Sequence, residues 1–263
     1  MAYVIYGVVQ EPAVVGASMT GLQGRDVKFV AGCGLCAAVS EITDPKGAPP
    51  VSELLVYCKV VEDLHRLQAV VPMRYGCFLG GIGEIRNALK ERRRQYTTLL
   101  AQLAGHVEMG LRLLPAEKER RPRQVETTTA RDAFPPPVDG RAYLAQRKRH
   151  YQMQNEILQG CQESIDRYIR SFSGIFAKPR AETYTKHGGL VCSLYFLTPE
   201  TMVDRFREAF GRTAGNGEVK AMLSGPWPPY NFVTSDLAAA KLLEEKIKGE
   251  NNDGICNSDA NRS

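Results

Sequence analysis

The residue pair best suited to redox chemistry or metal binding in this sequence is a CxxC motif formed by Cys33 and Cys36. This spacing serves disulfide exchange in redox proteins and metal binding in zinc proteins. A redox pair needs a helix N-terminus to activate the thiol, and a tetrahedral zinc ion needs a second pair of ligands. Here the pair enters a stretch with strand character, where positions i and i+3 face opposite sides, and no second CxxC or HxxxH motif occurs. We therefore expect both cysteines to be structural.

A glycine-rich stretch and four histidines are the other candidates for chemistry. Gly80–Gly83 lies between a predicted strand and a predicted helix, where backbone amides can bind phosphate. However, Arg86 replaces the third glycine of the GxGxxG pattern and no GKS or GKT follows, so a flexible turn is favoured. No GxSxG nucleophile elbow occurs, and no motif links the histidines, which are His65, His106, His150 and His187. We expect no enzymatic activity, no metal and no cofactor.

The most distinctive segment, Gly225 to Val233, reads GPWPPYNFV and contains the single tryptophan of the chain. Because proline fixes φ and lacks a backbone N–H, we expect the preceding strand, residues 218–224, to stop here and the segment to adopt polyproline II geometry. The three-residue repeat of that geometry would place Trp227 and Tyr230 on one side, with Pro228 and Pro229 as spacers. The sequence therefore predicts a stiff aromatic platform.

Other interpretations of this segment remain open. The aromatic residues could plug the end of a hydrophobic core, as tryptophan often does, or anchor an interface, where Trp and Tyr are enriched. A PxxP ligand of an SH3-type groove is disfavoured because no Arg or Lys flanks the prolines. The candidate partner-contact or structural residues are Gly225, Pro226, Trp227, Pro228, Pro229, Tyr230 and Phe232.

A second candidate segment, residues 71–76, reads VPMRYG and contains Pro72, Arg74 and Gly76. We expect residues 70–77 to form a strand, which would place Arg74 within an apolar strand after Pro72. A buried guanidinium must be paired and hydrogen-bonded. The sequence therefore indicates an ion pair with a carboxylate such as Glu84 or Glu108, and leaves an interface charge as the alternative.

The composition indicates a soluble protein of two domains. The chain has 263 residues, of which 43% are hydrophobic, and its seven cysteines are scattered, so disulfides are not expected. Its formal net charge of +5 is below the basicity of a dedicated nucleic-acid binder, and its three basic runs, 90–94, 118–123 and 147–150, are expected to be solvated faces. No stretch of about 18 apolar residues and no signal peptide is present, so we expect a cytosolic protein without a membrane segment.

Hydrophobic periodicity predicts a mixed α+β domain over residues 1–104. Strands are expected at residues 3–9, 27–31 and 35–42, the last two forming a hairpin. A second helix is expected from the glycines at 80–83 to about Gly105. An amphipathic helix is expected over 51–68, with an apolar face of Val51, Leu54, Leu55, Cys58, Val61 and Leu64.

From residue 105 the predicted order is strand, helix, strand, strand, helix, strand, which is the split βαβ of a ferredoxin-like domain. This second domain covers residues 105–235 and has a variable insertion at 115–139. Its first helix, 140–171, carries a seven-residue apolar repeat, which we interpret as a helix lying on its own sheet rather than a coiled coil. A C-terminal helix is expected within 236–250, followed by a disordered tail over 251–263.

A ferredoxin-like fold with basic patches raises the alternative of a small-ligand or RNA-binding module. Tyr195 and Phe196 lie on a predicted strand that could stack bases. However, residues 189–197 lack the basic and glycine positions of the RNP1 signature. We therefore expect no nucleic acid partner.

Three sets of residues resemble the gas vesicle protein F and L family. GPWPPYNFV at 225–233 is similar to the family's carboxy-terminal signature, and VPMRYG at 71–76 is similar to its mid-domain LPLRFG segment. Residues 3–8, 21–24 and 37–41 are similar to its amino-terminal strands. The matches keep the order of the family from residue 3 to residue 233, although the CGLC sequence at 33–36 departs from its usual pattern.

The resemblance implies two α+β domains, the second a modified ferredoxin-like fold with a variable insertion. It also implies a non-enzymatic accessory and minor structural protein of gas vesicles. Such a protein would bind the small hydrophobic major shell subunit (GvpA type), limit its premature aggregation and help nucleate or extend the shell. Other gas vesicle accessory proteins are further candidate partners. The expected location is the gas vesicle, with a cytoplasmic stage before assembly.

Overall fold

A computed structural model describes residues 2–12, 19–43, 49–114, 147–148, 159–186, 189–214 and 220–233. The predicted insertion, C-terminal helix and polar tail lie outside these residues, as does most of the predicted helix over 140–171. The chain divides into two compact units: one comprises Met1–Glu108 and the residues from Trp227 onward, and the other comprises Met109–Pro226. The domain boundaries predicted at residues 104 and 235 stay predictions.

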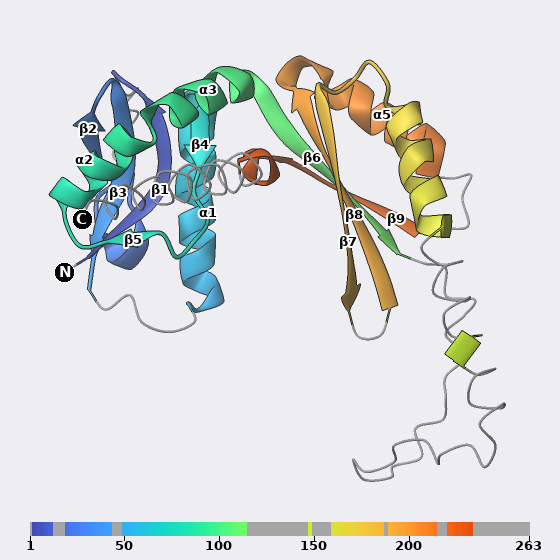
Figure 1. Ribbon diagram of the computed structural model, residues 1–263, viewed down its shortest axis with the longest axis horizontal. Coiled ribbons are helices and arrows are strands. Elements are labelled where there is room, and N and C mark those ends of the chain that lie inside the picture. The colour runs from blue at the N-terminus through green and yellow to red at the C-terminus, as the bar shows by residue number, and fades with distance from the viewer. Residues whose placement is uncertain are drawn as a thin grey trace, which may run out of the picture. The chain divides into compact units, whose positions relative to one another are not determined.

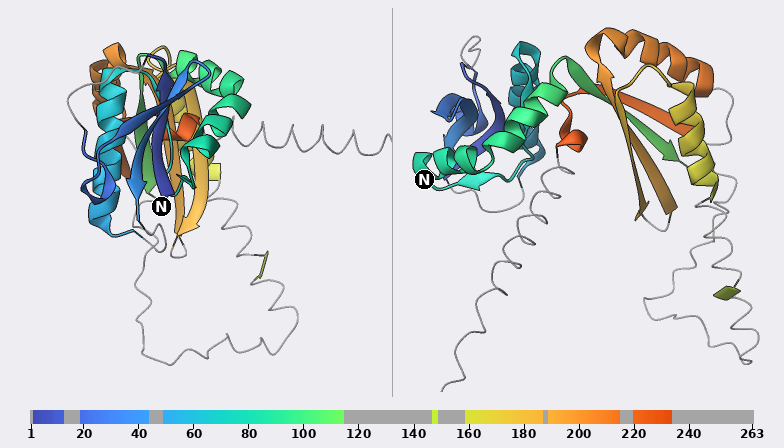
Figure 2. Two further views of the ribbon diagram at one scale, coloured as in Figure 1. Left: turned by 90° about the vertical axis from the view of Figure 1, so that its left-hand side faces the viewer. Right: turned by 45° about the horizontal axis from the view of Figure 1, so that its top comes forward.

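The first unit is built on an antiparallel sheet with the strand order β2-β3-β1-β4, in which β5 also pairs with β1 (Figure 1). Helix α1 covers one face of this sheet, and α2 and α3 cover the other (Figure 2). Because both faces are covered, β3 reads as a nearly continuous apolar run. The elements are β1 (Ala2–Gln10), β2 (Lys28–Gly32), β3 (Leu35–Ile42), α1 (Val51–Leu67), β4 (Val70–Pro72), β5 (Phe78–Leu79), α2 (Ile82–Glu91) and α3 (Arg93–Leu103), with a short 3-10 helix η1 (Leu22–Gly24) after β1.

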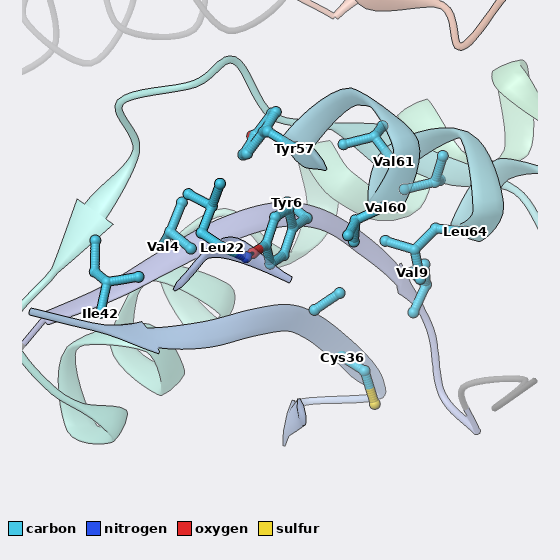
Figure 3. Close-up of a cluster of buried hydrophobic side chains, with 12 residues drawn as sticks. Val4, Tyr6, Val9, Leu22, Cys36, Ile42, Tyr57, Val60, Val61 and Leu64 are labelled. Atoms are coloured by element: carbon cyan, nitrogen blue, oxygen red, sulfur yellow. Dashed lines mark hydrogen bonds between the residues drawn. The ribbon is translucent and has the colours of Figure 1, made fainter. Parts of the chain in front are cut away.

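A bulge in β1 decides which side chains of this strand face α1. The register with β3 shifts between Ile5 and Gly7, so the alternation of side chains is interrupted there. As a result Val4, Tyr6 and Val9 all join the buried cluster beneath α1 (Figure 3). The Tyr6 hydroxyl accepts a hydrogen bond from the Leu22 amide at 2.8 Å and donates one to Ser40 Oγ at 3.2 Å, which satisfies the polar end of a fully buried ring.

The helix predicted to run to Gly105 is interrupted. It consists of α2 and α3, which meet at Arg92, whose φ of −105° and ψ of 16° are not helical. Gly105 follows α3 with a φ of +67°, the left-handed conformation that commonly ends a helix.

The second unit contains a four-stranded sheet with the order β7-β8-β6-β9. The helical residues 159–171 and α5 cover one face of it (Figure 1). This arrangement is the ferredoxin-like one that the sequence predicts, and the α+β class is confirmed. The elements are β6 (His106–Leu114), β7 (Lys178–Lys186), β8 (Gly189–Pro199), the 3-10 helix η3 (Glu200–Met202), α5 (Val203–Ala214) and β9 (Lys220–Trp227).

An aromatic cluster forms the core of the second unit. Phe172, Phe196 and Phe206 are all fully buried. The ring centroids of Phe172 and Phe206 lie 4.4 Å apart, and Phe196 lies 5.3 Å from each. Such tilted and edge-on pairs add to the burial of apolar area. Since Phe196 belongs to this core, the hypothesis that Tyr195 and Phe196 together stack RNA bases is wrong.

Candidate partner-contact segment

The GPWPPYNFV segment begins in β9 and ends in a 3-10 turn, η4 (Tyr230–Phe232). β9 passes through Pro226 and ends at Trp227, beyond the end predicted at Ser224. A proline is tolerated there because β9 is an edge strand of its sheet. The strand therefore carries the first proline of the segment, Pro226, and Pro228 and Pro229 follow its end.

The predicted polyproline II platform is wrong. Pro229 has a ψ of 61°, whereas polyproline II requires about 145°. The chain instead turns sharply, and the Tyr230 amide donates a hydrogen bond to the Pro228 carbonyl at 2.8 Å. Trp227 and Tyr230 consequently lie in different surroundings. Trp227 is 45% exposed, while Tyr230 packs against the buried cluster of the first unit.

A buried carboxylate anchors the far end of the segment. Glu108, near the start of β6, is only 4% exposed. Its two oxygens accept hydrogen bonds from the Asn231 backbone amide at 2.8 Å and from Asn231 Nδ2 at 2.7 Å. Hydrogen bonds to a charged acceptor contribute about 1.5–3 kcal/mol each. The next two residues, Phe232 and Val233, are buried as well, so the segment after Trp227 is held firmly in the first unit.

The hydroxyl of Tyr230 lies in an apolar and acidic environment. It is buried and has no hydrogen-bond partner among the described residues. Burial raises the pKa of Tyr230 most, and the nearby Cys58, Glu62 and Glu108 raise this pKa further. The phenol therefore stays neutral and acts as a packing residue, which supports the core-plug interpretation for this half of the segment.

The prediction of a buried, ion-paired Arg74 is wrong. β4 ends at the buried Pro72, and Arg74 lies beyond the strand with an exposed side chain. In the part of the chain that the structure describes, Arg74 has no ion pair. Glu108 binds Asn231 instead, and Glu84 accepts a hydrogen bond from the Gly80 amide at 2.8 Å. Gly76 has a φ of +105°, a conformation that favours glycine and that ends the extended chain before β5.

Residues from all three sets that carry the family resemblance pack together in the first unit. Pro72 is the register partner of Gly7, which joins the mid-domain segment to the first strand. The Tyr57 hydroxyl lies 2.9 Å from the carbonyls of both Ile5 and Met73, to which its O–H donates. Tyr230 packs against the same cluster. Much of these residue patterns therefore reflects core packing, whereas Trp227 is a large apolar side chain of the signature that remains at the surface.

The remaining motifs show structural roles. Cys33 and Gly34 form the turn between β2 and β3, with φ values of +57° and +79°, and the flanking Gly32 and Leu35 are paired in register. Cys33 is exposed, whereas Cys36 is buried against α1, so the two thiols do not form one site. No group of three or more His, Cys, Asp or Glu residues capable of holding a metal occurs among the described residues.

The glycine-rich stretch before α2 is also not arranged for an anion. The Glu84 carboxylate already accepts the hydrogen bond from the Gly80 amide and lies in the first turn of the helix. A carboxylate at this place complements the positive end of the helix dipole and repels a phosphate. The turn interpretation therefore fits the local electrostatics.

The structure exposes apolar side chains that the sequence had assigned to the core. The buried face of α1 consists of Tyr57, Val60, Val61 and Leu64, so the apolar face predicted for this helix is rotated. Val51 is 71% exposed and Leu55 is 65% exposed. Together with the exposed Cys58, they follow the helical spacing i, i+4, i+7, and we call these three residues the outer face of α1. No described helix is both long and apolar enough to cross a membrane.

Comparisons with known proteins agree with this architecture. The chain is 22% identical over 244 residues to gas vesicle protein F2 of Halobacterium salinarum, a match that covers 91% of this chain and 95% of the relative. Crystal structures of GvpF from Anabaena sp. PCC7120 and from Microcystis aeruginosa have TM-scores of 0.70 and 0.69 at 16% and 14% identity. These matches cover 89% of this chain, and 96% and 99% of the two structures. The sequence model of gas vesicle synthesis protein GvpL/GvpF matches residues 2–234, and the chain therefore belongs to the GvpL/GvpF family.

Proposed function

We propose that this chain is an accessory and minor structural protein of gas vesicles that binds the hydrophobic major shell subunit (GvpA type). By covering apolar surface of that subunit it limits premature aggregation and assists nucleation and growth of the shell. Other gas vesicle accessory proteins are further partners in this scheme. The protein is cytoplasmic before assembly and belongs to the gas vesicle afterwards.

The observation that carries this proposal is the exposure of Trp227 directly before a stretch of chain that is anchored in the first unit. Pro228, Pro229 and Phe232 are buried, and Asn231 is bound to Glu108, so the chain that follows Trp227 is fixed. Trp227 itself is 45% exposed. A large aromatic side chain on an ordered backbone loses little conformational entropy on binding, which is why tryptophan dominates binding hot spots.

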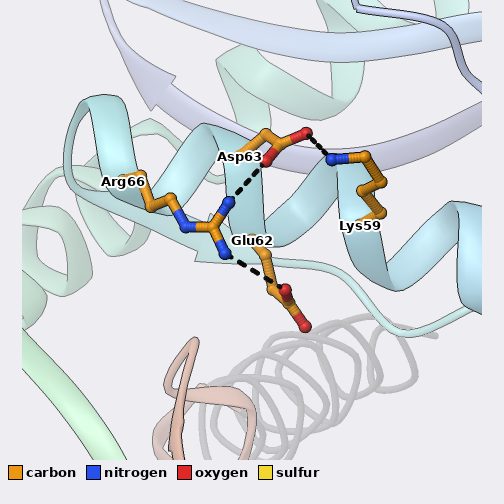
Figure 4. Close-up of polar contacts among 4 residues, drawn as sticks. All are labelled: Lys59, Glu62, Asp63 and Arg66. Carbon is orange, nitrogen blue, oxygen red and sulfur yellow. Dashed lines mark hydrogen bonds and ion pairs between the residues drawn. The ribbon is translucent and has the colours of Figure 1, made fainter.

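The outer face of α1 supports the same conclusion. Its apolar residues occupy the first half of the helix, while the second half of the exposed side carries Lys59, Glu62, Asp63 and Arg66 (Figure 4). These four charges pair with one another: Lys59 lies 3.1 Å and Arg66 2.9 Å from Asp63, and Arg66 lies 3.7 Å from Glu62. The helix therefore offers a partner an apolar surface next to a neutral polar one. Exposed apolar surface of this kind is typical of protein interaction sites.

A pull-down of the purified protein against the shell subunit tests the proposal. Trp227→Ala and the double variant Val51→Ser/Leu55→Ser should fold normally, because these side chains are exposed, and each should weaken capture. For a tryptophan hot spot the loss is about 2 kcal/mol or more, or about thirtyfold in Kd. Tyr184→Ala removes another exposed aromatic side chain, 39% exposed, and serves as the matched control.

A deletion of residues 116–138 in the same assay asks whether the predicted variable insertion takes part. If the folded wild-type protein fails to capture the shell subunit, the proposed function is refuted. If it binds but the Trp227 and α1 variants bind equally well, the function stands and these two surfaces are not the contact.

A further inference from the structure

The junction of α2 and α3 concentrates positive charge. Residues 86–94 contain five cations and a single carboxylate, Glu91, which gives this stretch a formal charge of +4 out of the +5 of the whole chain. All six charged side chains are exposed. We call the cations the basic junction; they are Arg86, Lys90, Arg92, Arg93 and Arg94.

The fold explains why these cations gather at one place. Ile85 and Leu89 of α2, and Tyr96 and Leu99 of α3, are buried and hold both helices on the sheet. The side chains between these anchors must therefore point to solvent. At the break, Arg92 makes a hydrogen bond with the hydroxyl of Tyr96, which is only 4% exposed, so the junction is fixed in place.

The basic junction differs from the charged surfaces of α1 and α5 because, among the described residues, ion pairs do not neutralise its charge. On α1 the cations are paired with Glu62 and Asp63 (Figure 4). On α5, Arg207 and Arg212 are paired with Asp204 and Glu208. Among the described residues, Arg86, Lys90, Arg93 and Arg94 have no ion pair.

Like charges add to this imbalance. Arg86 and Lys90 are separated by one helical turn on α2, and such pairs repel each other. An anionic partner would relieve this repulsion and would be attracted from a distance in an ionic-strength-dependent way. The hydroxyls of Thr97 and Thr98, on the next turn, donate to the carbonyls of Arg93 and Arg94 and are not available to such a partner.

We propose that the basic junction is a docking site for an acidic, Asp- or Glu-rich segment of a partner protein. Arginine forks match carboxylates in geometry as well as charge. A nucleic acid is disfavoured because binding of single strands requires exposed aromatic platforms, and the one aromatic residue here, Tyr96, is buried. The basic surface is also confined to nine residues, since the rest of the chain sums to a formal charge of only +1. This inference concerns a surface separate from Trp227 and does not depend on the proposed function.

Fluorescence anisotropy with a labelled oligoglutamate of about 15 residues tests the proposal, in parallel with an oligouridylate of equal length and with vesicles containing phosphatidylserine. The test variant is Lys90→Glu/Arg93→Glu/Arg94→Glu. The matched control is Arg205→Glu/Arg207→Glu/Arg212→Glu, which changes the net charge equally and also alters exposed helical positions. Circular dichroism of both variants establishes that each is folded.

We expect the wild-type protein to bind oligoglutamate with an affinity that falls as salt increases. The junction variant should lose at least about tenfold in affinity, since three exposed ionic contacts are removed, whereas the control should lose less than about threefold. Equal losses in the two variants, or no binding of oligoglutamate by the wild type, would overturn the proposal. Tighter binding of oligouridylate or of the vesicles than of oligoglutamate would also overturn it.

Discussion

Removal of the Asn231 side chain tests how the signature segment is held. Asn231→Ala deletes the 2.7 Å hydrogen bond from Nδ2 to Glu108 Oε1 but keeps the backbone bond to Oε2 at 2.8 Å. Glu108 is only 4% exposed, so water poorly replaces the hydrogen bond that this substitution removes. A hydrogen bond to a charged group contributes about 1.5–3 kcal/mol, and we therefore expect the first unit to lose about 2 kcal/mol of unfolding free energy.

Two measurements separate this effect from a general loss of structure. Urea unfolding followed by circular dichroism gives the stability. Acrylamide quenching of Trp227, the single tryptophan, reports on the segment itself and should increase in the variant under native conditions. Asn87→Ala, at an exposed position of α2, is the control and should change stability by less than about 0.5 kcal/mol. If Asn231→Ala matches this control in both measurements, the carboxylate does not anchor the segment.

Three further predictions concern the two cores. Gly21→Ala should lower the unfolding free energy by about 1–3 kcal/mol, because an added Cβ would collide with the Tyr6 hydroxyl and with Ser40 Oγ. The control is Gly83→Ala, whose Cβ would meet open space. Equal urea midpoints of the two variants would contradict the steric argument. Phe206→Ala should lower the free energy of unfolding by about 3–5 kcal/mol in the same assay, since it leaves a cavity between two fully buried rings. A loss below about 1 kcal/mol would contradict this, because it would mean that neighbouring side chains repack into the cavity. Burial, and then contact with Cys192, raises the pKa of Cys161 from 9.0 to about 12. The pKa of Cys161 is higher in the folded protein than in the unfolded protein. The contribution of this thiol to stability is therefore present below about pH 9 and is lost as the pH rises toward 12. Iodoacetamide at pH 9 should therefore modify the exposed Cys33 well before Cys161, and equal rates, measured by peptide mass spectrometry, would contradict this.

Local pattern was sufficient for much of the fold. The strand β3 has the bounds predicted from the sequence, β6 begins directly after residue 105, where the second domain was predicted to open with a strand, and α1 ends one residue earlier than expected. These elements have strong periodicity and clear boundaries: prolines and a glycine precede α1, and Gly105 precedes β6. The ferredoxin-like order also follows from the sequence of elements, because few topologies connect them.

Side-chain environment was much harder to predict. Arg74 is exposed because β4 stops at Pro72, and Phe196 rather than Tyr195 faces the core because the strand register places it there. Val51 and Leu55 have the helical spacing of core residues, yet the sheet contacts a different face of α1. In each case the neighbour that decides burial is distant in sequence, so no local pattern records it.

The sequence by itself determined the order of the elements, the α+β class and the membership of the GvpL/GvpF family, since hydrophobic period, turn residues and short motifs are properties of neighbouring residues. Only the tertiary structure decided that Glu108 holds Asn231 across more than a hundred residues and that Tyr230 packs against the core while Trp227 remains at the surface. It also decided that Arg86, Lys90, Arg93 and Arg94 have no ion pair among the described residues. The physical reason is that hydrogen-bond partners, burial and charge neutralisation depend on which distant residues the fold brings together.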